Sequence, residues 1–222
     1  MTTEQSGTGV SRAGRSAHTA DAGTSLVGGH PALDFANTVA WRTDDSRRVE
    51  RVTGDEGWLR WAVRAGVLDD DQCGPLVTAT AEQPRDSVRA GAERAALADF
   101  RAVLSTVLDA LVDGESPPSA EWRSLRRTIL RAREEAELAP DFPLRWQLGM
   151  TRFGDLLNIL ALSAEDLLAG TSLARIRRCE GPGCGWFFLD GSRSGTRRWC
   201  SSGDCGNRDR ARRHYSRTQR AR

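Results

Sequence analysis

Apolar residues recur every three or four positions over much of residues 50–170, which is the spacing of a buried helix face. The clearest run stops at Gly114, and glycine commonly follows the last turn of a helix. The spacing predicts helices over residues 53–65, 70–81, 86–113, 119–138 and 151–168.

Two of these helices carry start signals. Thr53 and Glu56 have the spacing of a capping box, in which each side chain bonds a free backbone N–H of the other residue. Ser119 is the expected N-cap of the helix over 119–138. The side chains predicted to point inward from that helix are Trp122, Leu125, Ile129 and Leu130.

A shorter stretch alternates between apolar and other residues. Leu33, Phe35, Asn37 and Val39 share one side, which predicts a strand over 33–39. Further short strands are expected over 142–148 and 173–177. The fold class expected is therefore mainly α with short β elements, an α+β fold.

Polar residues within this stretch allow two interpretations. A buried Asn37 or Asp34 must find hydrogen-bond partners, so these residues either bond neighbouring backbone or line a ligand pocket. Buried polar groups more often serve the fold, which favours the first interpretation. His30, beside two glycines and a proline, is more typical of a turn than of a ligand.

Four cysteines near the C-terminus have the spacing C-x4-C-x15-C-x4-C, with glycines in both short loops. Two tight knuckles separated by a hairpin-sized stretch are typical of a tetrahedral zinc site, so we predict one zinc ion held by Cys179, Cys184, Cys200 and Cys205. Four protein ligands leave no open position, so this ion would be structural. The alternatives are two disulfides, free thiols or an iron–sulfur cluster.

Residues 1–25 bear on the disulfide alternative. They lack the basic and apolar regions of a signal peptide, so we expect a cytoplasmic chain with reduced cysteines and a disordered N-terminal tail. No apolar stretch reaches the ~20 residues that a membrane span requires.

The segment around the cysteines predicts a hairpin followed by a helix. Strands are expected at 186–190 and 196–199, and a helix after Cys205. The chain's formal charge of +2 hides a separation, because residues 171–222 carry 13 arginines and four acids whereas the rest carries 19 arginines and 26 acids. A basic, metal-braced segment favours contact with nucleic-acid phosphates. The alternative is a solvated surface, or one that docks on the acidic part of the chain.

Arginines in this segment are the candidate DNA contacts. Arginine suits phosphate and guanine because it can donate two parallel hydrogen bonds. The residues predicted to contact DNA are Arg197, Arg198, Arg208, Arg212, Arg213 and Arg217.

The C-terminal motifs resemble a known family. Cys184-Gly185-Trp186, Arg198-Trp199-Cys200-Ser201 and Cys205-Gly206-Asn207-Arg208 together resemble the CGNR zinc finger found at the C-terminus of bacterial transcription regulators. This resemblance implies a structural zinc and a DNA-binding role for residues 171–222, which we call the finger.

The start of the preceding domain resembles the ABATE domain, the usual companion of this finger, through its Gly-Gly, Leu-Asp and Asn-Thr steps followed by an arginine. The resemblance implies a small-molecule pocket in residues 26–170, which we call the first domain. The residues we would place in that pocket are His30, Asp34, Asn37 and Arg42.

The function expected is a transcription regulator, in which the first domain senses a small molecule or mediates oligomerisation and the finger contacts DNA. A homodimer is expected if DNA is the target, because a single module buries only about 600–1,000 Å². The alternative is an adaptor for RNA or protein that exposes Trp186, Phe187 and Trp199. No convergent acid–base set is evident, so we do not expect an enzyme.

Overall fold

A computed structural model describes residues 25–69, 88–138 and 146–220, together with positions 73, 74, 76, 78, 140, 142 and 144. All but the last residue of the expected tail over 1–25, and most of the expected helix over 70–81, lie outside these residues. Within them the chain is mainly helical with small antiparallel strand pairs, which confirms the predicted fold class. None of the described helices is both long and apolar enough to span a membrane.

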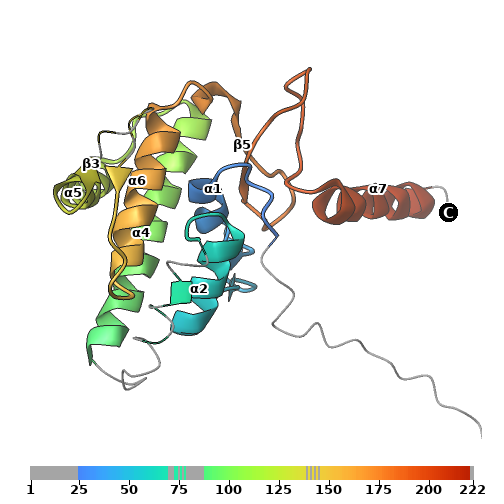
Figure 1. Cartoon of the computed structure of the whole chain (residues 1–222). Coiled ribbons are helices and arrows are strands. Elements are labelled where there is room, and N and C mark those ends of the chain that lie inside the picture. The colour runs from blue at the N-terminus through green and yellow to red at the C-terminus, as the bar shows by residue number, and fades with distance from the viewer. Residues whose placement is uncertain are drawn as a thin grey trace, which may run out of the picture.

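Three helices form the body of the first domain: α4 (Val88–Asp113), α5 (Ser119–Glu134) and α6 (Asp155–Ala169). Figure 1 shows α4 and α6 side by side, and α5 packs against both of them. Their facing sides bury a row of leucines, and removing this apolar surface from water stabilises the helix packing. Those fully buried are Leu97, Leu104, Leu108, Leu125, Leu156 and Leu160.

Helix α5 departs from its prediction in length and orientation. Pro118, not Ser119, is the N-cap, and the helix ends at Glu134. Residues Glu137–Leu138 form strand β3, which pairs with β4 (Trp146–Gln147). The prediction that Trp122 and Leu130 point inward was wrong, because these side chains are 47% and 46% exposed. Only the narrow strip of α5 through Leu125 faces the neighbouring helices.

The predicted strand over 33–39 was wrong. Residues Pro31–Ala36 form helix α1, and only Val39–Ala40 form a strand, β1, which pairs with β2 (Val49–Glu50). Proline at the first helical position and His30, whose Nδ1 accepts a hydrogen bond from the Ala32 N–H, start the helix. Alternation misled because α1 is buried on nearly every side, so its buried positions show no period.

Helix α2 (Gly54–Arg64) contacts α1 through aromatic side chains. Phe35 of α1 lies within 6.0 Å of the ring centres of Trp58, Trp61 and Phe100, and this aromatic group joins α1, α2 and α4. Thr53 is the N-cap of α2 but makes no side-chain capping bond, so the predicted capping box does not form.

The finger begins with a short 3-10 turn, η1 (Leu173–Arg175), and strand β5 (Ile176–Arg178). Strand β5 pairs antiparallel with β6 (Phe187–Leu189), so the hairpin encloses the first knuckle. The predicted returning strand over 196–199 was wrong: this segment is irregular, and side chains and loop backbone hold it in place. A π-helical turn, η2 (Ser202–Gly206), leads into α7 (Asn207–Arg220), which projects away from the body of the protein in Figure 1.

Candidate metal centre and nucleic-acid interface

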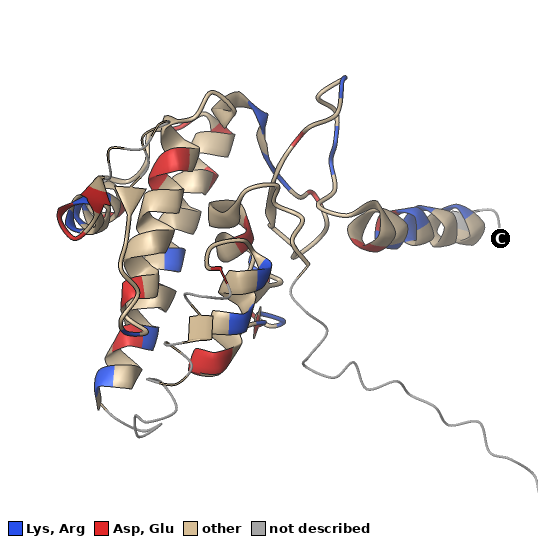
Figure 2. Ribbon diagram, in the orientation of Figure 1, with Lys and Arg blue, Asp and Glu red and all other residues tan. Residues whose placement is uncertain are grey.

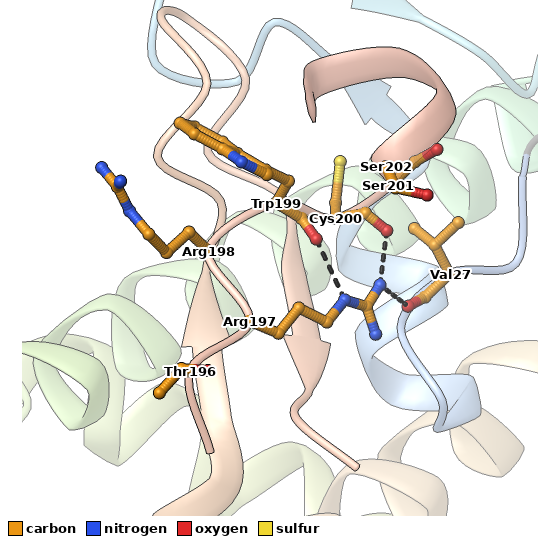
Figure 3. A pocket seen from close by; sticks show the side chains of 8 residues that line it. All are labelled: Val27, Thr196, Arg197, Arg198, Trp199, Cys200, Ser201 and Ser202. Carbon is orange, nitrogen blue, oxygen red and sulfur yellow. Dashed lines mark hydrogen bonds between the residues drawn. The ribbon is translucent and has the colours of Figure 1, made fainter. Parts of the chain in front are cut away.

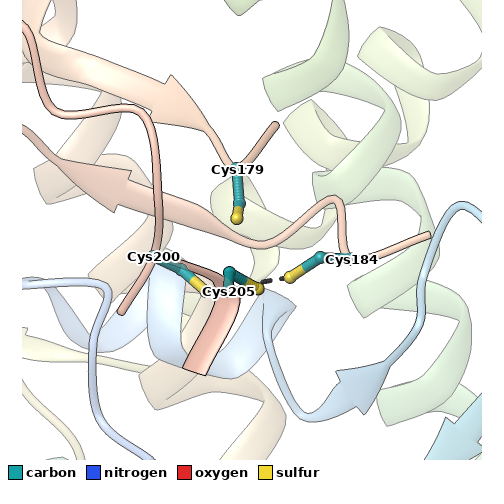
Figure 4. Close-up of side chains that lie close together, drawn as sticks. All are labelled: Cys179, Cys184, Cys200 and Cys205. Carbon is teal, nitrogen blue, oxygen red and sulfur yellow. Dashed lines mark hydrogen bonds between the residues drawn. The ribbon is translucent and has the colours of Figure 1, made fainter. Parts of the chain in front are cut away.

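The side chains of Cys179, Cys184, Cys200 and Cys205 converge (Figure 4), and their sulfur atoms all lie within 4.8 Å of one another. The Sγ atom of Cys200 lies 3.7 Å from those of Cys184 and Cys205. Zinc–sulfur bonds of about 2.3 Å in a tetrahedron separate the sulfurs by about 3.8 Å, whereas a disulfide requires about 2.05 Å. The four buried cysteines therefore form a zinc-binding site, and they can fill all four positions around the ion.

Local contacts set the space and the protonation of these four sulfurs. Gly181 lies so close to the site that a Cβ atom there would stand 2.9 Å from the Sγ of Cys205. Hydrogen bonds within the cluster, first from Cys184, hold the pKa of Cys179 down at about 7. Hydrogen bonds from the other cysteines, followed by one from Arg208, hold the pKa of Cys205 well below its usual range. The same network of hydrogen bonds raises the pKa of Cys184 and Cys200 above the usual range. Zinc binds thiolates, so it must displace the protons that these two sulfurs hold.

Arg208 compensates the charge of the site. Zinc with four thiolates carries a net charge of −2, and the guanidinium of Arg208 donates to the Sγ of Cys205 at 2.8 Å. The same guanidinium lies 4.6 Å from the ring centre of Trp41 in the first domain. The last residue of the Cys-Gly-Asn-Arg motif thus joins the metal site to the first domain.

Trp186 and Phe188 pack with the four cysteines in a small core, whereas Phe187 belongs to the main core of the protein. Phe187 and Phe188 are fully buried and Trp186 is 9% exposed. The adaptor alternative requires Trp186 and Phe187 to be exposed, and their burial contradicts that part of it. Trp199 is half-buried, with the guanidinium of Arg198 5.0 Å from its ring centre.

Two family models match the chain in the order that the sequence motifs suggest. Residues 29–171 match ABATE, described as "Putative stress-induced transcription regulator", and residues 175–218 match the CGNR zinc finger. The chain belongs to the ABATE family. No curated protein matches it.

The ABATE domain and the CGNR finger share a hydrogen-bonded interface. The side-chain amide of Asn37 donates to the carbonyl of Phe187 and accepts from its N–H, both at 2.8 Å. The indole N–H of Trp186 donates to the carbonyl of Val39 at 2.6 Å. Asn37 is fully buried. Its amide supplies the hydrogen bonds that the backbone of Phe187, at the edge of the hairpin, would otherwise need from a neighbouring strand.

An ion-pair cluster reinforces this interface from α4. Arg42 donates two hydrogen bonds to Asp109, at 2.7 and 2.8 Å, and two more to the carbonyl of Gly185. Arg178 of the finger pairs with Asp109 and Asp113 at 2.8 and 2.7 Å. Burial raises the pKa of Asp109, but hydrogen bonds from the two arginines outweigh it and hold that pKa below its usual range.

The turn after β1 docks directly on the first knuckle. The backbone N–H groups of Arg42 and Thr43 donate to the carbonyls of Cys184 and Gly183. Trp41 adopts a left-handed backbone conformation, with φ of 55°, and its ring is covered by the guanidinium groups of Arg47 and Arg208. A non-glycine residue in this conformation is held by its surroundings, here by packing between two arginines.

The residues that the sequence placed in a ligand pocket lie in contacts within the protein. Asn37 and Arg42 bond the finger, and Asp34 accepts from the backbone N–H of Gly28 at 2.8 Å. Burial raises the pKa of Asp34, opposed by backbone hydrogen bonds. His30 caps α1 and contacts Asp166 of α6 at 3.1 Å. These contacts favour the structural interpretation for all four residues.

Helix α7 is the most basic and most exposed element among the described residues (Figure 2). Every residue from Arg210 to Gln219 is exposed. The helix contains six arginines against the single acid Asp209. Asn207 donates to the carbonyl of Gly203, which orients the start of the helix on η2.

The candidate arginines fall into two structural groups. The first group is Arg197 and Arg208, whose guanidinium groups bond other parts of the protein. The guanidinium of Arg197 donates to the carbonyls of Trp199 and Cys200 and to that of Val27 in the ABATE domain (Figure 3). It also lies 4.2 Å from the ring centre of Phe188. Arg197 therefore braces the second knuckle, and Arg208 braces the zinc site.

The second group faces solvent. Arg212 and Arg213 both pair with the buried carboxylate of Asp209, which fixes the stems of these side chains while leaving half or more of each exposed. Arg217 is exposed and donates to the backbone carbonyl of Arg213, at 3.4 Å. Arg198 is exposed and paired with Glu180.

Sequence reasoning missed Asp109, Asp113, Arg178 and Trp41. The two aspartates lie four residues apart at the end of a long apolar helix, a spacing that places both on one side of it. That signal was present in the sequence, but many exposed helices carry similar acidic pairs. Their partners Arg42 and Arg178 lie 65 to 69 residues away along the chain, so only the folded structure brings them together.

Proposed function

We propose that this protein is a zinc-dependent DNA-binding transcription regulator, with residues 26–170 as its sensing or oligomerisation domain and residues 171–222 as its DNA-binding finger. The observation that carries the proposal is helix α7. Beyond Arg210, whose guanidinium donates to the carbonyl of Ser202 in η2, its side chains make no hydrogen bond or ion pair with another element among the described residues. The zinc site and η2 nevertheless hold the first turn of the helix in place.

The dimensions of α7 suit a DNA groove. Its 14 residues span about 21 Å at 1.5 Å per residue, and the major groove of B-DNA is about 12 Å wide. Its exposed arginines Arg213 and Arg217 lie four residues apart, along one side of the helix. In the proposed complex these residues and Arg212 contact phosphate or guanine, and Arg198 contacts the flanking backbone.

The internal contacts of Arg197 and Arg208 assign them a different part in this function. The guanidinium of Arg197 donates to carbonyls of the finger and to that of Val27 in the first domain, and the guanidinium of Arg208 donates to the Sγ of Cys205. We therefore propose that they set the position of α7 and leave phosphate binding to the exposed group.

The test is binding of the zinc-loaded full chain to genomic DNA fragments across a salt series. A variant with Arg213→Gln and Arg217→Gln is compared with a control carrying Arg126→Gln and Arg127→Gln on the exposed side of α5. Each lost phosphate contact lowers the slope of log K against log salt by about 0.9, so the α7 variant should lose about two units and the control none.

Two outcomes would overturn the proposal. If the zinc-loaded protein shows no affinity for DNA at low salt, the finger serves another partner, and single-stranded RNA is the next probe. If both variants lose the same slope, binding reflects general charge and not α7.

A further inference from the structure

A hollow of about 500 Å³ lies where the last turns of α4, the first turn of α5 and the end of α6 meet. Most of its lining is apolar, and the connection between α4 and α5 forms part of its wall. Ligand sites in proteins commonly enclose about 300–1,000 Å³, are mainly apolar and occur between packed helices. The apolar lining residues are Val107, Leu111, Pro117, Trp122 and Leu168.

Trp122 is the most informative residue of this lining. It is 47% exposed, although Leu125 on the next turn of α5 is fully buried. An indole ring in the wall of a hollow offers a broad apolar face against which a flat ring can stack. A bound aromatic molecule would remove this face from water.

The lining also restricts the charge of its occupant. Glu115 is the one charged residue among those that line the hollow, and it is exposed. Ser116 and Ser119 add hydroxyl groups that can donate or accept hydrogen bonds. The carboxylate repels anions and attracts cations, so a neutral or cationic molecule fits this lining better than an acid.

Helix α4 contributes both to the lining of the hollow and to the interface with the finger. Val107 and Leu111 line the hollow, whereas Asp109 and Asp113 of the same two turns pair with Arg42 and Arg178. A ligand that shifts these turns would therefore change the ion pairs that hold the finger. This arrangement gives the hollow a physical connection to α7.

We propose that this hollow is the effector site of the protein, and that its effector is a compact aromatic molecule, neutral or positively charged. The inference rests on the proposed sensing role of the first domain. Binding to the hollow can nevertheless be measured without DNA, so the two proposals fail separately.

The experiment titrates the zinc-loaded full chain with indole, tryptamine and indole-3-acetate in a calorimeter. These probes share one ring system and differ in charge. We expect tryptamine and indole to bind, and indole-3-acetate to bind about tenfold more weakly than tryptamine. Glu115→Gln should reduce this difference between tryptamine and indole-3-acetate, and because Glu115 is exposed the variant should fold normally.

Trp122→Ala tests the stacking surface and should weaken indole binding about tenfold. Trp146→Ala is the matched control, because Trp146 is also a partly exposed tryptophan, at 38%, but does not line the hollow. Equal effects of the two variants, no binding of any probe at millimolar concentration, or a charge order that Glu115→Gln leaves unchanged would overturn the proposal.

A second copy of the chain is the competing occupant. Sedimentation velocity of the wild type and of Trp122→Ala distinguishes it: a dimer that this substitution converts to a monomer would make the hollow a subunit contact and overturn the effector site. Ligand binding that follows the expected pattern in a chain without DNA affinity would support the hollow and sink only the regulatory function.

Discussion

Asn37 and Phe187 lie 150 residues apart, yet they exchange two hydrogen bonds of 2.8 Å in a fully buried position. A side-chain amide has the same donor and acceptor as a peptide group, so Asn37 completes the hairpin of the finger from within the first domain. The fold of the finger therefore depends partly on a residue of the first domain that lies 150 positions earlier in the sequence. This relationship explains why the zinc site and the first domain should be tested together.

Replacing Asn37 should destabilise the whole chain. Asn37→Ala leaves the buried N–H and carbonyl of Phe187 without partners, which we expect to cost about 2–4 kcal/mol. Urea unfolding followed by circular dichroism measures this loss. Asp99→Ala, at an exposed position on α4, is the control and should change stability by less than about 0.5 kcal/mol. A loss at Asn37 no larger than the control would show that the interface does not contribute to folding.

Zinc affinity should depend on the absence of a side chain at residue 181. In Gly181→Ala the added Cβ would stand 2.9 Å from the Sγ of Cys205, so the sulfur must move and zinc affinity should fall about tenfold or more. Gly191→Ala is the matched control, because a Cβ at that position meets nothing within 4 Å. Competition with a chromophoric chelator reports both affinities. Unchanged affinity in Gly181→Ala would mean that the knuckle adjusts without strain.

Asp109 should make the stability of the interface sensitive to acid. Its pKa is lowered in the folded protein, so its contribution is complete above the pKa of the unfolded chain, about 3.9, and is lost as the pH falls through the folded value. Wild type should therefore lose more stability than Asp109→Asn between pH 6 and pH 3. Chemical unfolding across this range measures the difference. Asp99→Asn, on the exposed side of α4, should retain the wild-type slope.

Arg197 and Arg217 should separate folding from DNA binding. Arg197→Gln removes bonds to backbone carbonyls in both parts of the chain, so it should lower thermal stability by several degrees. Arg217→Gln removes an exposed charge, so it should leave stability nearly unchanged and reduce the salt slope of DNA binding by about one unit. Thermal unfolding and the salt series are measured on both variants. The opposite pattern would reverse the roles that the structure gives these arginines.

Metal removal should affect α7 more than the first domain. The zinc site anchors η2, and an isolated helix of this length is marginal in water. Chelation should therefore lower helix content by an amount close to the length of α7, while the helices around Leu104 and Leu160 persist. Hydrogen exchange across the two regions distinguishes this from loss of the entire fold. Unchanged exchange in α7 after chelation would mean that the ion does not hold the helix.

Local patterns in the sequence determined the elements whose signal is local. The apolar spacing of α4, the stop at Gly114 and the four cysteines all lie within short windows. The zinc ligands could be predicted because a tetrahedral thiolate site needs two tight knuckles, and glycine-rich loops between cysteines indicate such knuckles in the sequence. The excess of arginine after residue 170 could likewise be counted without a structure.

The tertiary structure alone decided what depends on partners distant in the sequence. Residues 33–39 alternate as a strand would, but residues up to Ala36 belong to a helix that is buried on nearly all sides, so its sequence shows no helical period. Asn37 bonds the finger and does not line a pocket. Arg197 and Arg217 look alike in the sequence. They differ because one guanidinium reaches free carbonyls in a folded loop whereas the other extends from an uncovered helix, and that difference arises only when chain segments far apart are brought together.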